Sequence, residues 1–257
     1  MSASGKDLRT MLKRLHLDAN ERSCINHEIE TRVLQDSVHV NAPNFTTISD
    51  ADLRCLFDRY DELFFDSQLR HALGVIPLDF RVSPRMTRAG GKTGSWRKNR
   101  NSPIERFEIT ISSTLLAQTF QNDQTSRTIR VTGLECRTRL DALMRVMEHE
   151  LVHLAELLGW DSSSCSRSRF QSIAWRVFGH TDHQHTLITP RESAATVGIH
   201  PGTLVRFNFH GQSLQGIVNR VTKRATVLVR ADDGEPYSDG HAYRKHYVPV
   251  EMLKPVD

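Results

Sequence analysis

The sequence predicts an α+β fold in two parts, a mixed domain of helices and strands followed by a small C-terminal β-barrel. Apolar residues recur at the helical period of three and four positions within 49–64, 138–159 and 170–178. From residue 204 onward they instead alternate with polar residues, as in short strands. The chain has 257 residues, 25% of them charged and 38% hydrophobic, which is typical of a protein with a packed core.

Residues 1–48 are expected to form an N-terminal extension that is partly helical or flexible. Leu8, Leu12 and Leu15 suggest one helix, and NAPNFTT at 41–47 is typical of a linker. The start of the chain lacks the apolar run of a signal peptide, and no stretch approaches the length of a membrane span. We therefore expect a cytoplasmic protein with no membrane partner.

Residues 49–190 are expected to form the main domain. Ser49 is placed to cap a helix with a regular apolar stripe. Strands are predicted in VIPLDFRVS at 75–83 and RFEITISSTLL at 106–116, because short apolar runs there lie between Pro, Gly and Ser. The segment RTIRVTG at 127–133 fits either an edge strand or a loop.

A long helix is predicted to begin near Thr138, where Asp141 completes a capping-box pattern, and to stop at Gly159. A second helix follows, with an apolar stripe from Phe170 to Phe178 at the helical period and a glycine directly after it. The two helices are expected to pack against each other.

Residues 200–257 are predicted to form the small β-barrel. LVRFNF, LQGIVNRV and ATVLVR show period-two patterns, and the short segments HGQS and TKR separate them. The Tyr-rich segment YRKHYVPVEML follows near the end of the chain. Short strands joined by tight turns favour a strongly curved sheet or a barrel, and such barrels often bind nucleic acid or peptides.

The string HELVH at 149–153 indicates a metal site. Side chains four residues apart lie on one face of a helix, so His149 and His153 can direct ring nitrogens at one ion. Zn²⁺ is the expected cofactor. Glu150 is offset by one residue, so its carboxylate can take a proton from a zinc-activated water, whose pKa falls to about 7. The surrounding leucines predict a buried helix, in which a cation is a simple partner for these polar groups.

Four separate segments resemble, in order, the SprT-like domain of the Spartan type of zinc metalloprotease. They are FDRYDELFF at 57–65, LDFRVSPRMTRAGGKT at 78–93, ITISSTLL at 109–116, and HELVH followed by the helix that opens at Phe170. The resemblance covers roughly residues 49–190. It implies a zincin-like metalloprotease domain, zinc held by the two histidines and the glutamate as general base. It also implies a DNA-repair activity, the proteolysis of proteins crosslinked to DNA.

The third zinc ligand departs from the family pattern. The family has a histidine four residues before the phenylalanine of the second helix, and here that position is Ser166. Cys165 is the first candidate in its place, because a thiolate with two histidines forms some catalytic zinc sites. His180 is the alternative, and it lies in a cluster with His183 and His185. The other interpretation of that cluster is a polar loop that caps the preceding helix.

The segment 81–106 is strongly basic and is the expected contact with DNA. It contains eight lysines and arginines against one acid, Glu105. Cations around a tryptophan can bind the phosphates and one base of a single strand. The expected nucleic-acid contacts are Arg85, Arg88, Lys92, Trp96, Arg97 and Lys98, with Arg100 beside them. A solvated hairpin with an anchored tryptophan is the other interpretation.

Together these patterns predict a zinc-dependent metalloprotease of the SprT-like type that acts on DNA-associated proteins. The alternative is a non-catalytic zinc-containing protein that binds nucleic acid. A closed site with four protein ligands would favour the alternative, and an open site with three would favour the enzyme. A cysteine protease based on Cys165 is disfavoured, because no pattern fixes a histidine partner. The sequence does not indicate the oligomeric state or the cleavage specificity.

Overall fold

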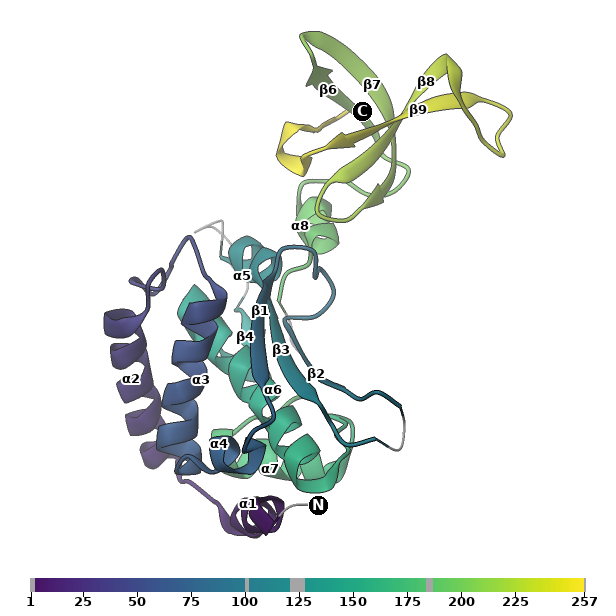
Figure 1. Cartoon of the computed structure of the whole chain (residues 1–257). Coiled ribbons are helices and arrows are strands. Elements are labelled where there is room, and N and C mark those ends of the chain that lie inside the picture. Colours follow the sequence, from purple (N-terminus) through teal and green to yellow (C-terminus); the bar gives the residue numbers. More distant parts are fainter. Residues whose placement is uncertain (1–2, 100–101, 121–127, 184–186, 257) are drawn as a thin grey trace. The chain divides into compact units, whose positions relative to one another are not determined.

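The computed structural model divides the chain into two compact units, Met1–Leu187 and Ile188–Asp257 (Figure 1). These are unit 1 and unit 2. The residues that the structure describes are 3–99, 102–120, 128–183 and 187–256. Two residues of the sequence analysis, Arg100 and His185, lie outside these ranges. Within them, no helix has both the length and the apolar character needed to cross a membrane.

Unit 1 combines helices with a three-stranded sheet, which confirms the α+β prediction. Its helices are α1 Ala3–Arg14, α2 Ala19–Asp36, α3 Asp50–Phe65, α4 Gln68–Leu73, α5 Ser113–Thr119, α6 Arg139–Trp160 and α7 Ser168–Phe178. Its strands are β1 Leu78–Ser83, β2 Gly91–Trp96 and β3 Arg106–Ser112, with a short pair β4 Arg130–Val131 and β5 Leu134–Glu135. The segment RTIRVTG, whose sequence fits either an edge strand or a loop, contains β4.

The sheet has the order β1-β3-β2, so β3 is central and β2 is an edge strand. β1 runs parallel to β3 with Leu78 opposite Phe107, and β2 runs antiparallel with Gly91 opposite Ile111. β3 is the most apolar of the three, and Phe107, Ile109 and Ile111 are fully buried. The edge position leaves one side of β2 free of strand pairing within the described sheet.

Helix α6 is the centre of unit 1. It packs against β2 and β3 of the sheet and against α1, α4, α5 and α7 (Figure 1). α3 packs on β1, and α2 packs on α3. The N-terminal helices therefore belong to the same compact unit as the motif helix, and Leu8 and Leu12 of α1 are fully buried.

The local predictions for the helices that carry the site are confirmed. Ser49 caps α3, and Thr138 caps α6 in a capping box with Asp141. α6 extends one residue beyond the predicted end at Gly159 and stops because Asp161 takes a left-handed conformation with φ 58°. α7 ends at Gly179, also left-handed, and its apolar stripe packs on α6.

Unit 2 is a helix and an antiparallel sheet. Its elements are α8 Pro190–Thr196, β6 Leu204–Phe209, β7 Gln212–Val221, β8 Ala225–Pro236, β9 Ala242–Val248, a 3₁₀ turn Val250–Met252 and β10 Lys254–Pro255. One face of the sheet is buried, and Val205, Val218 and Val227 form its core together with Ala194 of α8. The period-two segments of the sequence are strands, as predicted.

The predicted β-barrel is wrong, because the sheet is open. Its order is β10-β6-β7-β8-β9, and β9 and β10 are the two edges in the described part of the chain. Period-two alternation shows that one face is buried, but it does not show whether the first and last strands pair. β10 is two residues long and ends in Pro255, which has no backbone N–H to donate to a further strand. The predicted nucleic-acid or peptide ligand of unit 2 stays a prediction.

Candidate metal centre

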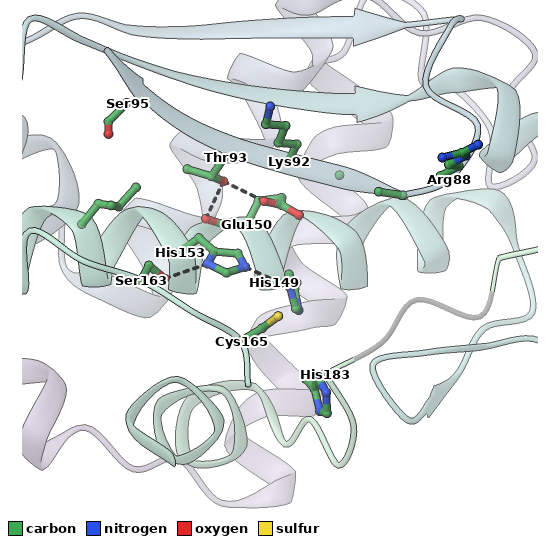
Figure 2. Close-up of a pocket in the computed structure, with 13 residues that line it drawn as sticks. Arg88, Lys92, Thr93, Ser95, His149, Glu150, His153, Ser163, Cys165 and His183 are labelled. Atoms are coloured by element: carbon green, nitrogen blue, oxygen red, sulfur yellow. Dashed lines mark hydrogen bonds between the residues drawn. The ribbon is translucent and has the colours of Figure 1, made fainter. Parts of the chain in front are cut away.

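His149 and His153 lie one turn apart on α6 and direct their rings toward the same point (Figure 2). Their Nε2 atoms are 3.2 Å apart. Both rings pack on Phe170 of α7, with ring centroids 4.8 and 4.5 Å away. Two nitrogens bound to one tetrahedral zinc at about 2.0–2.1 Å lie about 3.3 Å from each other. The separation of the two rings therefore fits a shared zinc ion.

Cys165 brings the third donor to this pair. It lies in the loop between α6 and α7, and its Sγ and one ring nitrogen of each histidine are all within 4.8 Å of one another. A thiolate and two imidazoles form a donor set that suits Zn²⁺. Ser166, at the position of the family histidine, instead places its hydroxyl 2.9 Å from that of Ser164.

His180, the alternative ligand, is engaged elsewhere. Its Nε2 lies 2.8 Å from Glu148 Oε2 in a buried cluster. Tyr60 donates to Glu148 Oε1 at 2.8 Å, and Arg145 contacts the same carboxylate at 2.7 Å. Burial lowers the pKa of His180, against the nearby Glu148, which raises it. The structure thus places His180 in a packing network of α6 and not with His149 and His153.

His153 is oriented from its far side by the loop after α6. Ser163 Oγ lies 2.7 Å from His153 Nδ1 and donates to Glu156 Oε2 at 2.7 Å. Arg169 Nε donates to the other oxygen of Glu156 at 2.5 Å. Burial lowers the pKa of His153 to about 4, although the Glu156 charge raises it. The ring is therefore neutral at neutral pH, which is the form that ligates a metal.

Glu150 lies beside the histidines and is held by β2. Thr93 Oγ1 donates to Glu150 Oε2 at 2.8 Å and also lies 3.1 Å from the backbone oxygen of Glu150 (Figure 2). β2 approaches α6 closely at Gly91, where a Cβ atom would lie 2.6 Å from Glu150 Oε1. Burial raises the pKa of Glu150 to about 8, against the hydrogen bonds of Thr93, which lower it. A dication next to it would favour the ionised form again, because opposite charges stabilise each other.

These side chains open on one cavity of about 590 Å³. Its lining includes His149, Glu150, His153, Ser163, Cys165 and Thr93. Its other lining groups include Arg88 and Lys92 from the basic segment and His183 from the chain after α7 (Figure 2). A volume of this size is typical of ligand sites and can admit a short stretch of substrate.

The members of the basic segment differ in what they contact. Of the expected nucleic-acid contacts, Arg88 and Lys92 are exposed and line the cavity. Trp96 is 40% exposed, and the Arg106 guanidinium lies over its ring at 4.6 Å. Arg97 forms an ion pair with Asp161. The remaining members, Arg85 and Lys98, are exposed and are not among the residues that line the cavity.

The sequence analysis does not single out Thr93, Glu156 and Ser163, which contact the centre, or Glu148, which binds His180 away from it. Glu148 and Glu156 are fully buried on α6. Buried acids within an apolar helix require partners, so these two could have been noticed from the helix pattern alone. Thr93 and Ser163 are polar residues in other segments, and only the fold brings them to the motif.

A scan against protein-family models, a search of curated proteins and a search of solved structures each found no match to this chain. The function is therefore inferred from the chemistry of the centre. The SprT-like resemblance stays a prediction from the sequence.

Proposed function

We propose that the chain is a zinc-dependent metallopeptidase of the SprT-like type, with His149, His153 and Cys165 as the zinc ligands. The observation that carries the proposal is the 3.2 Å separation of the two Nε2 atoms, with the Cys165 thiol within reach and a cavity in front of them. Bound there, Zn²⁺ would polarise a substrate carbonyl and lower the pKa of a water molecule.

Glu150 is the proposed general base. Its carboxylate lies on the cavity wall next to His149, and Thr93 fixes it through Oε2. The carboxylate takes a proton from the attacking water and can then deliver that proton to the leaving amine. Thr93 orients this carboxylate so that little rotamer freedom is lost on the way to the transition state.

The alternative function, a nucleic-acid-binding protein with a structural zinc, requires a closed site. Structural zinc is held by four protein ligands. In the part of the chain that the structure describes, the metal-binding group has three members and faces a cavity. This geometry favours catalysis over a structural role.

We further propose that the substrates are proteins on DNA. Arg88 and Lys92 place two exposed cations at the cavity that holds the histidines. Cations at this place can hold a phosphate backbone near the scissile peptide. This part of the proposal also relies on the SprT-like resemblance.

The test combines zinc content with cleavage, measured on the intact chain and on Glu150→Gln. We expect about one zinc per chain in both proteins, and a loss of cleavage of about 10²–10⁴-fold in the variant, the usual contribution of a general base. Glu251→Gln, an exposed glutamate of unit 2, is the matched control and should cleave like the wild type. The substrate is one protein supplied free and bound to single-stranded DNA, and faster cleavage of the bound form is expected.

Each outcome separates the proposals. Cleavage that survives Glu150→Gln would remove this residue from its role. Zinc binding without cleavage by the wild type would favour the binding protein. Equal cleavage of free and DNA-bound substrate would contradict the DNA part alone.

A further inference from the structure

The ring of His153 is connected to a buried carboxylate through one hydroxyl group. Ser163 Oγ lies 2.7 Å from His153 Nδ1 on one side and 2.7 Å from Glu156 Oε2 on the other. Glu156 is fully buried, and its second oxygen accepts from Arg169 Nε. We propose that Ser163 and Glu156 are a positioning pair that fixes the tautomer of His153, so that its Nε2 lone pair faces the metal. This inference rests on the proposed function.

The direction of each hydrogen bond follows from the number of protons available. A carboxylate only accepts, so the single proton of the Ser163 hydroxyl points to Glu156. The Ser163 oxygen must then accept a proton from His153, and it receives the one on Nδ1. A neutral imidazole carries one N–H, which leaves Nε2 with a free lone pair. That nitrogen is the atom 3.2 Å from His149 Nε2.

The same carboxylate also holds the loop that carries Cys165. Glu156 Oε2 accepts from the backbone N–H of Ser164 at 3.4 Å. Arg169, paired with Glu156, donates to the backbone oxygen of Ser162 at 2.8 Å. One buried acid therefore acts on two of the proposed ligands, the ring of His153 and the loop around Cys165.

The contacts of Ser163 and Glu156 between α6 and the following loop would also stabilise the fold. The test must therefore measure which nitrogen of His153 carries the proton. Glu156→Gln makes this possible without a change of side-chain volume. The amide oxygen of the new side chain should turn to Arg169, which only donates, and its NH₂ group should then donate to Ser163. The Ser163 hydroxyl is then free to donate to His153 Nδ1, which moves the imidazole proton to Nε2. A structural tie predicts no such inversion.

The experiment reads the tautomer of His153 by two-bond ¹H–¹⁵N correlation spectra of the metal-free full chain. The wild type should carry its proton on Nδ1, Ser163→Ala should show a mixture, and Glu156→Gln should carry it on Nε2. Ser163→Thr keeps the hydroxyl and should therefore retain the wild-type tautomer. Ser164→Ala is the matched control, because its hydroxyl contacts Ser166 and not a histidine.

A second readout is zinc affinity, measured by competition with a chromophoric chelator. Loss of an outer partner of a ligating histidine typically weakens metal binding by about 10–100-fold. We expect that loss in Ser163→Ala and Glu156→Gln, and wild-type affinity in Ser163→Thr and Ser164→Ala. Thermal unfolding of the metal-free variants identifies any that do not fold. If Glu156→Gln does not fold, Ser163→Ala still tests the inference, because it leaves the buried carboxylate of Glu156 in place.

Two results would overturn the inference: a wild-type His153 with its proton on Nε2, or a Ser163→Ala variant with unchanged tautomer and zinc affinity. Failure of the proposed function looks different. A chain that binds zinc with the expected tautomer, but shows no Glu150-dependent cleavage, would keep the positioning pair and lose the peptidase.

Discussion

Helix α6 carries two fully buried glutamates eight residues apart, and each serves a histidine in a different way. Glu148 contacts the Nε2 atom of His180 directly, at 2.8 Å. Glu156 reaches His153 through Ser163, and the nitrogen it influences is Nδ1. In the first region the carboxylate occupies Nε2 of the histidine. In the second it leaves that nitrogen facing the cavity.

The two histidines therefore differ in which ring nitrogen contacts the partner, Nε2 in His180 and Nδ1 in His153. His180 is almost completely buried beside Phe178, and the Glu148 cluster ties it to α3 through Tyr60. His153 also has a buried glutamate nearby, Glu156, but Ser163 lies between them and His153 lines the cavity. We infer that the Glu148 cluster contributes to stability and the Glu156 cluster to metal binding. Variants of each cluster test that separation.

The largest effect is expected from Arg145→Met, which breaks the Glu148 cluster. Arg145 is the only arginine or lysine paired with Glu148 among the described residues, and its side chain is 12% exposed. Removal of one partner of a buried ion pair leaves an uncompensated charge and costs about 3–5 kcal/mol of unfolding free energy. The measurement is urea unfolding with a metal chelator present, so that zinc binding does not contribute.

Arg137→Met is the matched control for Arg145→Met. Arg137 pairs with Glu135, but its side chain is 84% exposed. A surface pair of this kind should change the unfolding free energy by less than about 1 kcal/mol. Equal losses in the two variants would contradict the role given to the Glu148 cluster.

The next prediction compares the two histidines directly. His153→Ala removes a proposed ligand, so zinc affinity should fall by more than about 100-fold, beyond the loss expected for an outer partner. His180→Ala should bind zinc like the wild type, but it leaves a Glu148 oxygen without one partner and should cost about 1–3 kcal/mol of unfolding free energy. Chelator competition and urea unfolding of the metal-free proteins give the two quantities. A His180→Ala variant that loses zinc as His153→Ala does would show that the two regions are not separate.

The helices of this comparison could be predicted from the sequence, because their signals are local. Thr138 and Asp141 mark the start of α6, and the spacing of His149 and His153 places both rings on one face. The apolar stripe of α7 and the glycine that ends it are local in the same sense. Each signal lies within a few residues of the feature that it predicts.

The rest of the centre depends on contacts between distant segments. Thr93 reaches Glu150 across 57 residues, and His180 reaches Glu148 across 32. The sequence favours Cys165 over His180 because Cys165 lies next to the expected position, but its approach to the histidines depends on the path of the loop after α6. The barrel prediction failed for the same reason. A sheet closes into a barrel only if its edge strands, here β9 and β10, pair with each other, and the sequence pattern of neither strand predicts that pairing.

The smallest effect is expected at a third carboxylate–histidine pair, Asp52 with His39. In this pair the carboxylate is buried and the histidine is exposed. Asp52 accepts from the His39 backbone N–H at 3.0 Å, and His39 Nδ1 lies 3.1 Å from its other oxygen, but the His39 side chain is 41% exposed. Burial alone would raise the pKa of Asp52, yet the hydrogen bonds from Ser49 and His39 outweigh burial and lower it below 3.8. Because the pKa is lower in the folded state, these contacts stabilise the fold fully above pH 3.8, and their contribution is lost as the pH falls through the folded-state value.

Asp52→Asn should therefore remove about 1 kcal/mol of unfolding free energy at neutral pH, the usual size of a lost helix cap. Below pH 3.8 the difference between variant and wild type should shrink, because the wild-type carboxyl is then protonated too. Urea unfolding of both proteins between pH 3 and pH 7 measures the difference. A constant difference across that range would mean that the Asp52 charge is irrelevant and that only the shape of the cap matters. Asp58→Asn, which removes the exposed partner of Arg70, is the matched control and should change stability little at any pH in that range.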